Sequence, residues 1–269
     1  MKEFKIISNS TNDYDSLAIE SNRIQECLEE MKRRNLKNMA INSAFGWEIG
    51  TQIDFIKDNL WIEGIQIGED NIDISIINNL TNLKRLGIGT AKIKGRLDFC
   101  NFPNLEILSV MWIEKQYSNL YCATNLKFIS INKFPYDNFE KMSGFSKLEW
   151  LQLNYGKLKS VDGVQYIKKL KYFDLYSMPS LESLTGMKGI TESLETFSIE
   201  KCKNADLSVL REMLNLKVLH ILDCSPLASV DFVKKMSNLK HAYFGIEILD
   251  RDVSVLKERG FDVKKSKNY

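Results

Sequence analysis

The stretch Lys147-Leu-Glu-Trp-Leu-Gln-Leu153 decides the fold, because its spacing of leucines recurs along most of the chain. Clear copies start at Asn82, Asn104, Asn125, Lys169, Ser193, Asn215 and Asn238, and two weaker copies include Leu36 and Ile62. The first apolar residues of the ten copies are 26, 21, 22, 21, 22, 22, 24, 22 and 23 residues apart: Leu36, Ile62, Leu83, Leu105, Leu126, Leu148, Leu170, Leu194, Leu216 and Leu239. The chain therefore repeats one short unit with a period near 22 residues.

Each copy reads L-x-x-L-x-L, which at this period is the signature of a leucine-rich repeat. One copy cannot bury its leucines alone, so stacked copies share one continuous core and one parallel sheet. We predict an α/β leucine-rich repeat solenoid, a curved stack with one parallel sheet on its concave face and irregular or short helical segments on its convex side. Residues 36–247 are expected to form about ten repeats, between an N-terminal cap over residues 1–35 and a C-terminal cap and tail over residues 248–269.

Both ends of such a stack need caps, because the terminal repeats would otherwise expose their cores. The sequence predicts a strand over residues 4–7 and then an amphipathic helix after Ser21, with one apolar face made of Ile24, Cys27, Leu28 and Met31. At the other end Asp252 is expected to cap a short helix that Gly260 ends, and residues 261–263 to form a last strand. The tail over residues 264–269 is predicted to be frayed.

The repeats resemble the 22-residue class found in bacterial internalins and related protein-phosphatase regulators, over roughly residues 36–244. The stretch Leu158-Lys-Ser-Val-Asp-Gly-Val-Gln-Tyr-Ile-Lys-Lys-Leu170 carries this resemblance. It implies a bacterial protein that binds other proteins and catalyses nothing. Two features depart from the family. Internalins are exported, whereas the first ten residues of this sequence hold too short an apolar run for a signal peptide. The asparagine that is usual at the ninth repeat position is also replaced, for example by Cys202 and Cys224. We expect these two cysteines to be small buried residues.

Composition excludes several functional classes. The 37 Lys and Arg residues nearly balance the 35 Asp and Glu residues, giving a net charge of +2, so the chain has no global attraction for nucleic acid. No apolar run approaches the roughly 18 residues of a membrane-spanning helix. Five cysteines, an odd number without a C-x-x-C pair, favour a reducing compartment. We expect a cytoplasmic protein that is monomeric when free, needs no cofactor, and binds neither nucleic acid nor membrane.

The binding residues follow from strand alternation, which points the third, fifth and seventh positions of each repeat toward the concave face. Aromatic residues gather there in consecutive central repeats, and exposed Trp and Tyr clusters are typical of protein-binding hot spots. Including the adjoining eighth positions, the predicted partner-binding residues are Trp112, Phe128, Trp150, Tyr155, Tyr172, Asp174, Tyr176, His220, His241 and Tyr243. The alternative is that these aromatic side chains simply pack on one another, or that the register slips by one residue in a repeat and turns a tryptophan inward.

Catalytic and metal sites are weakly supported by the sequence. His220 and His241 fall on neighbouring repeats, but no third metal ligand converges with them. Asp174, Ser198 and His220 occupy one row, but the serine lies between the other two, and a catalytic triad needs the histidine in the middle. The leading hypothesis is a non-catalytic intracellular protein-binding module, acting as an inhibitor or an immunity-type regulator. The alternatives are a secreted or surface-associated adhesin-like receptor and an enzyme that uses Asp174, His220 and His241.

Overall fold

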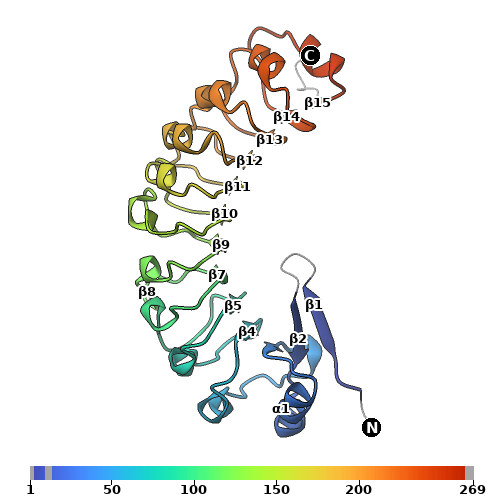
Figure 1. Ribbon diagram of the computed structural model, residues 1–269, viewed down its shortest axis with the longest axis vertical. Coiled ribbons are helices and arrows are strands. Elements are labelled where there is room, and N and C mark those ends of the chain that lie inside the picture. Colours follow the sequence, from blue (N-terminus) through green and yellow to red (C-terminus); the bar gives the residue numbers. More distant parts are fainter. Residues whose placement is uncertain (1–2, 10–13, 264–269) are drawn as a thin grey trace. The chain divides into compact units, whose positions relative to one another are not determined.

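A computed structural model describes residues 3–9 and 14–263 of the chain (Figure 1). The predicted frayed tail, residues 264–269, lies outside the described residues. The chain divides into two compact units, Met1–Leu126 and Lys127–Tyr269. Among the described residues, no helix is both long enough and apolar enough to cross a membrane.

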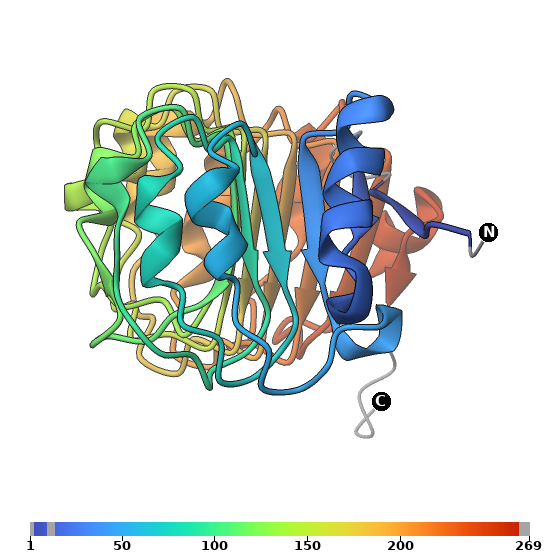
Figure 2. The same ribbon diagram turned by 90° about the horizontal axis from the view of Figure 1, so that it is seen from below.

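The first unit starts with an antiparallel hairpin of β1 (Ile6–Asn9) and β2 (Tyr14–Ala18), and helix α1 (Ile24–Arg33) lies alongside the first strands (Figure 2). From β2 onward the strands are parallel: β3 (Asn38–Ile41), β4 (Gly64–Ile67), β5 (Arg85–Ile88) and β7 (Ile107–Met111). Short 3-10 helices connect them: η1 (Ser21–Arg23), η2 (Ser43–Phe45), η3 (Asp54–Asp58), η4 (Ser75–Asn79), η5 (Phe99–Asn101) and η6 (Leu120–Cys122). Strands β6 (Leu97–Asp98) and β8 (Tyr117–Ser118) pair separately.

The second unit repeats the same strand and 3-10 helix alternation. Its strands follow in chain order and are all parallel: β9 (Phe128–Asn132), β10 (Trp150–Asn154), β11 (Tyr172–Tyr176), β12 (Thr196–Glu200), β13 (Val218–Leu222), β14 (His241–Gly245) and β15 (Asp262–Val263). The connecting helices are η7 (Glu140–Met142), η8 (Val164–Tyr166), η9 (Thr185–Ile190), η10 (Leu207–Glu212), η11 (Asp231–Lys235) and α2 (Ser254–Glu258).

The predicted strand register is confirmed. Each of the ten repeat strands begins at the third position of its motif, as β10 does at Trp150. On β10 the fourth and sixth positions, Leu151 and Leu153, are fully buried, while the third, fifth and seventh are half-buried. Alternate side chains therefore face the core and an outward face of the sheet, and this outward face carries the residues singled out in the sequence.

Within each unit the stacked repeats share a core, as the leucine spacing predicts. In the second unit a ladder of phenylalanines adds to the leucines, with ring centroids 5.9 Å apart for Phe139 and Phe173 and 5.8 Å apart for Phe173 and Phe197. All three rings are fully buried. Each repeat thus buries its aromatic and aliphatic groups against the next one, which holds the outward face of the sheet in place.

The turns after β9 to β13 each use a left-handed residue. Positive φ angles between 49° and 64° occur at the eighth repeat position, at Lys133, Tyr155, Ser177, Lys201 and Asp223. The backbone N–H of each donates to the last carbonyl of the following strand, for example from Tyr155 to Tyr176 at 2.9 Å and from Ser177 to Glu200 at 2.8 Å. The left-handed residue therefore links consecutive turns by a hydrogen bond.

A charge ladder follows the start of the strands. The second repeat position alternates in sign along the chain until the last repeat, through Lys37, Glu63, Lys84, Glu106, Lys127, Glu149, Lys171, Glu195, Lys217 and Lys240. Glu63 binds both Lys37 at 2.6 Å and Lys84 at 2.7 Å, and the Glu149–Lys171 and Glu195–Lys217 pairs are each 2.8 Å apart. Burial raises the pKa of Glu63, but hydrogen bonds from the two lysines more than offset it and leave that pKa lowered.

Helices and strands form at both ends of the described chain, some of them where the sequence predicts them. In α1 the predicted face is buried at Cys27, Leu28 and Met31, but Ser21 starts the preceding η1 and does not cap the helix. The N-terminal strand pairs with β2, which has no alternating pattern in the sequence and was not predicted. At the C-terminal end the residue at the N-cap of α2 is Val253, so Asp252 lies one residue before the expected capping position, and its carboxylate accepts from the Ser254 N–H at 2.9 Å. Gly260 adopts a φ of 69° after α2, and β15 pairs with β14.

Two cysteines are bonded, which the sequence interpretation did not anticipate. Cys100 on η5 and Cys122 on η6 form a disulfide between adjacent repeats, and their separation of 22 residues equals the repeat period. Cys202 is buried, as expected, and Cys224 is half-buried. Their thiols donate to the carbonyls at the ends of their own strands, Glu200 and Leu222, each at 3.3 Å, so they replace part of the polar contact of the missing asparagines.

Candidate protein-binding surface

A row of three aromatic side chains crosses the outward face of the second unit. Phe128, Trp150 and Tyr172 are the first residues of β9, β10 and β11, and the parallel register pairs them directly. Their ring centroids are 5.7 Å apart for Phe128 and Trp150 and 4.5 Å apart for Trp150 and Tyr172, whose planes differ by 21°. All three are half-buried. This aromatic row combines a stacked arrangement with partial access to solvent.

The inward neighbours explain why the row faces outward. Leu151 and Leu153 on β10, and Phe173 and Leu175 on β11, are at most 1% exposed and occupy the core side of the sheet. Strand alternation then places Trp150 and Tyr172 on the opposite side. The one-residue register slip considered as an alternative does not occur at these strands.

A polar row runs beside the aromatic row, at the fifth repeat position. Ser130, Gln152, Asp174 and Ser198 follow one another across β9 to β12. The Ser130 hydroxyl donates to the Gln152 side-chain carbonyl at 3.0 Å. Asp174 is half-buried, and burial raises the pKa of its carboxyl to about 6. This row therefore offers a ligand several hydrogen-bonding groups and one carboxyl group that ionises at a higher pH than a free aspartate.

A tyrosine pair extends the surface past the strand ends. Tyr155 and Tyr176 meet edge to face with centroids 5.2 Å apart, and Tyr155 is 53% exposed. The Lys201 ammonium lies 4.7 Å from the Tyr176 ring centre and donates to its hydroxyl. The hydrogen bond from Lys201 lowers the pKa of Tyr176, whereas the hydrogen bond with Tyr176 raises the pKa of Tyr155. The sequence prediction did not include Lys201 among the binding residues. A signal was present, because Lys201 occupies the eighth position of its repeat and Tyr176 occupies the seventh position of the preceding repeat.

The remaining predicted residues lie on the last repeat strands. His220 on β13 is paired in register with Tyr243 on β14, and His241 is paired with Val218. The two histidines are therefore diagonal rather than opposite, and both are exposed. Ser198 lies between Asp174 and His220, as the sequence order implies. Within residues 3–9 and 14–263, no group of three or more His, Cys, Asp or Glu side chains could hold a metal ion.

Trp112 does not belong to this surface, which corrects the sequence prediction. Its side chain lies in the first unit and is only 6% exposed. Its ring stacks on Phe99, with centroids 6.1 Å apart, and contacts Tyr117 at 5.3 Å. Trp112 follows the last residue of β7, so strand alternation no longer sets its direction, and the turn folds it into the core.

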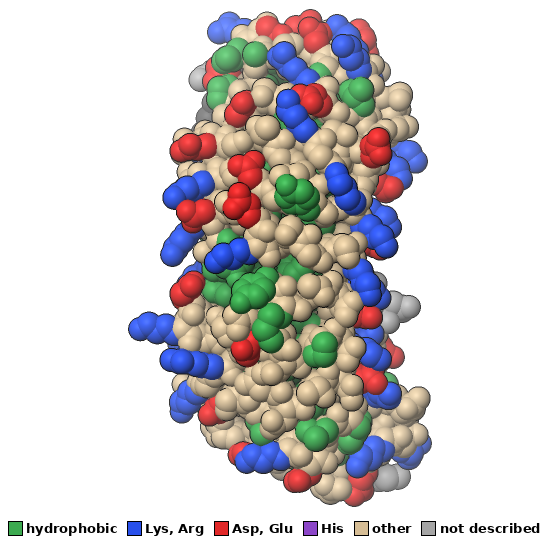
Figure 3. Space-filling view, turned by 60° about the vertical axis from the view of Figure 1, so that its left-hand side comes forward, with side chains coloured by type: hydrophobic (Ala, Val, Ile, Leu, Met, Phe, Trp, Pro, Cys, Tyr) green, Lys and Arg blue, Asp and Glu red, His purple; other side chains and the backbone are tan. Residues whose placement is uncertain are grey.

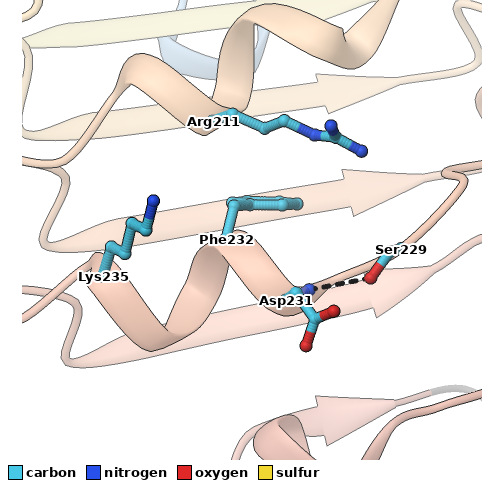
Figure 4. Close-up of a pocket in the computed structure, with 5 residues that line it drawn as sticks. All are labelled: Arg211, Ser229, Asp231, Phe232 and Lys235. Carbon is cyan, nitrogen blue, oxygen red and sulfur yellow. Dashed lines mark hydrogen bonds between the residues drawn. The ribbon is translucent and has the colours of Figure 1, made fainter.

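The helical side of the repeats offers a less convincing site. On the side shown in Figure 3, charged side chains line the flanks and hydrophobic ones form scattered groups between them. In the second unit, a pocket between η10 and η11 is lined by Arg211, Ser229, Asp231, Phe232 and Lys235 (Figure 4). The Asp231 N–H donates to the Ser229 hydroxyl at 3.1 Å, which closes a local turn (Figure 4). The pocket is lined mainly by exposed charged side chains of both signs and has no stacked aromatic group.

Comparison with solved structures supports the architecture. An internalin from Listeria monocytogenes superimposes with a TM-score of 0.55 and 16% sequence identity, over 95% of this chain and 87% of that one. The chain has the leucine-rich repeat fold. A leucine-rich repeat protein from Leptospira interrogans is similar with a TM-score of 0.53 and 14% identity, over 84% of this chain and 64% of that one. No protein-family model matches the sequence, and no curated protein matches it significantly.

At these identities the likeness establishes the leucine-rich repeat fold alone. The predicted resemblance to internalin-like repeats is confirmed at that level. The surface described above belongs to the sheet side of the repeats, and its composition is this chain's own.

Proposed function

We propose that this leucine-rich repeat chain is a non-catalytic module that binds a partner protein on the outward face of β9 to β12. One observation carries the proposal: Trp150 and Tyr172 are stacked, half-buried and held on a sheet whose inward side chains are fully buried. Tryptophan and tyrosine dominate protein-binding hot spots, and anchors held in their bound positions lose little entropy on binding. The neighbouring polar row and tyrosine pair supply the polar rim that such hot spots have.

The mechanism of this module would be occupancy of a surface. Asp174, Ser198 and His220 lie side by side with the serine in the middle, so the histidine cannot relay a proton between the other two. We propose a role as an intracellular inhibitor or immunity-type regulator, in which the bound face covers the active surface of its partner. Such a role requires a stoichiometric complex with one main partner.

A second candidate is favoured by the Cys100–Cys122 disulfide. Disulfides persist in oxidising compartments and are rare in the cytosol, so this bond supports an exported receptor that uses the same face. Differential alkylation in intact source cells separates the two candidates. Cys100 and Cys122 thiols that react without a reductant support the intracellular regulator, whereas thiols that react only after reduction support the exported receptor.

Affinity capture from a lysate of the source cells tests the shared part of both proposals. The wild-type chain is compared with a Trp150→Ala, Tyr172→Ala double variant and with Tyr166→Ala, which removes a 56% exposed aromatic side chain on η8 instead. One dominant protein retained by the wild type and Tyr166→Ala, and lost from the double variant, supports the proposal. A set of captured proteins that is identical for all three chains refutes it.

A further inference from the structure

Asp174 occupies the middle of the proposed binding face. Along β11 it lies between Tyr172 and Tyr176, and the register places Gln152 and Ser198 on its two sides. All five side chains are half-buried. The carboxylate is thus surrounded by uncharged groups on four sides, and the direction away from the core remains open.

Among residues 3–9 and 14–263 this carboxylate has no partner, in contrast to the acids around it. Within the described part of the chain, no hydrogen bond or ion pair reaches Asp174, and burial is what shifts its pKa. The nearby acids all have cations: Glu200 lies 3.6 Å from Lys201, Asp223 lies 3.3 Å from Lys203, Glu149 lies 2.8 Å from Lys171 and Glu195 lies 2.8 Å from Lys217. Asp174 is therefore the carboxylate of this face whose charge is left uncompensated within the described residues.

An uncompensated, partly desolvated carboxylate favours a cation from outside. Burying a charge is unfavourable unless an opposite charge or hydrogen bonds accompany it. Lys201, at the end of the neighbouring strand β12, already contacts Glu200 and the Tyr176 hydroxyl. The charge of Asp174 is consequently available to a ligand that brings its own positive group.

The aromatic row beside Asp174 indicates which kind of positively charged group would bind there. The stacked rings of Trp150 and Tyr172 begin two residues before the polar row on their strands. The planar guanidinium of arginine can bind a carboxylate through two N–H groups, and its aliphatic stem packs along apolar surface such as the aromatic row. We propose that this face recognises a basic side chain of the partner protein, preferably an arginine, whose guanidinium binds Asp174 while its stem lies on the Trp150–Tyr172 stack. This inference rests on the proposed protein-binding function.

A random peptide library displayed on phage tests the inference with a defined probe. Peptides are selected on the wild-type chain and their affinities are measured against Asp174→Asn, Glu200→Gln and the Trp150→Ala, Tyr172→Ala double variant. We expect the selected peptides to share an arginine or lysine and to bind Asp174→Asn roughly 10- to 100-fold more weakly, as expected for loss of a charge-assisted hydrogen bond. Glu200→Gln is the matched control, because it removes an acid from the same face that already has a lysine partner.

The outcomes separate the inference from the function on which it rests. Peptides that need Trp150 and Tyr172 but bind Asp174→Asn as tightly as the wild type overturn the basic-anchor inference and leave the binding function standing. If no selected peptide depends on Trp150 and Tyr172, both fail. In a second measurement, changing the selected basic residue to glutamate should abolish binding to the wild type and restore part of it with Asp174→Lys.

The pH dependence of the same peptides gives an independent reading. Affinity for the wild type should rise between about pH 5 and pH 7 as Asp174 ionises, and affinity for Asp174→Asn should lack this rise. On its own strand the titratable neighbours of Asp174 are Tyr172 and Tyr176, and the end of β12 adds Glu200 and Lys201. The outward residues of β10 do not titrate: Trp150, Gln152 and Asn154. Because Asp174→Asn leaves all of them and both histidines in place, the difference between the two pH curves reports Asp174 alone, and identical curves for the two proteins would contradict the inference.

Discussion

Replacing Asp174 by Asn should make the protein more stable at neutral pH, although most substitutions destabilise. The carboxyl is partly buried without a partner, and its pKa lies at about 6 instead of the 3.8 of a free aspartate. At roughly 1.4 kcal/mol for each tenfold change in proton affinity, ionising this group in the folded state costs at most about 3 kcal/mol. Solvent reaches part of the side chain, so we expect about 1 to 2 kcal/mol of this cost to appear as added stability in Asp174→Asn.

The sign of the pH dependence follows from proton binding. Between about pH 4 and pH 6 the folded protein keeps a proton on Asp174 that the unfolded chain has released, so the contribution of this group to stability falls as pH rises through that window. The advantage of Asp174→Asn should therefore be full above about pH 6 and vanish below about pH 4. A carboxylate that lowers stability while offering a binding group is a common compromise between stability and function.

Urea denaturation followed by circular dichroism, at about pH 7.5 and about pH 4, measures this difference. Comparing wild type with Asp174→Asn cancels the other groups that titrate in the same range, and Glu200→Gln serves as the control that should bring no gain in stability. The reasoning is refuted if Asp174→Asn is no more stable than the wild type at pH 7.5, or if its advantage is the same at both pH values.

Three further predictions concern the repeat architecture. Glu149→Lys places a lysine between Lys127 and Lys171 in the charge ladder, so it should lower the urea midpoint at low salt and recover most of it in about 0.5 M NaCl, where charges are screened within a few Å; an equal loss at both salt concentrations would contradict the electrostatic cause. Cys100→Ser opens a loop of one repeat and should cost about 3 kcal/mol under oxidising conditions and little in reductant, measured by urea denaturation with and without dithiothreitol; equal stability in both would show that the disulfide does not form. Ser177→Gly should be neutral or stabilising by up to about 1 kcal/mol because Ser177 has a left-handed φ of 55°, whereas Ser177→Val should destabilise by about 1 to 2 kcal/mol, both by thermal denaturation. The reverse order for the two Ser177 variants would contradict that account of the turn.

The leucine spacing predicted most of the fold because each repeat can bury its apolar residues only against its neighbours. It assigned the inward and outward positions of each repeat, and with them the outward positions of Trp150, Tyr172 and Asp174. Strand alternation is a property of extended backbone, so the prediction holds as long as the strand continues.

Features outside the strands were harder to predict. Trp112 lies one residue past β7, where the turn sets the direction of the side chain, and it is buried. Strand β2 is buried at three successive positions, so it lacks the alternation that reveals a strand in a sequence. The Cys100–Cys122 disulfide could have been predicted from the sequence, because the two cysteines are one repeat period apart and therefore lie at matching positions of adjacent repeats. The prediction used only the number of cysteines and the absence of a C-x-x-C pair, and it did not compare their spacing with the period.

In the proposed function, Trp150 anchors a partner protein on the outward face of the sheet. The most direct test is calorimetry with the captured partner, comparing the wild-type chain with Trp150→Ala and with Tyr166→Ala as the control. Loss of a central aromatic anchor should weaken binding by roughly 30-fold or more, equivalent to about 2 kcal/mol, while Tyr166→Ala leaves the affinity unchanged. An affinity that is unchanged in a folded Trp150→Ala variant would contradict the account.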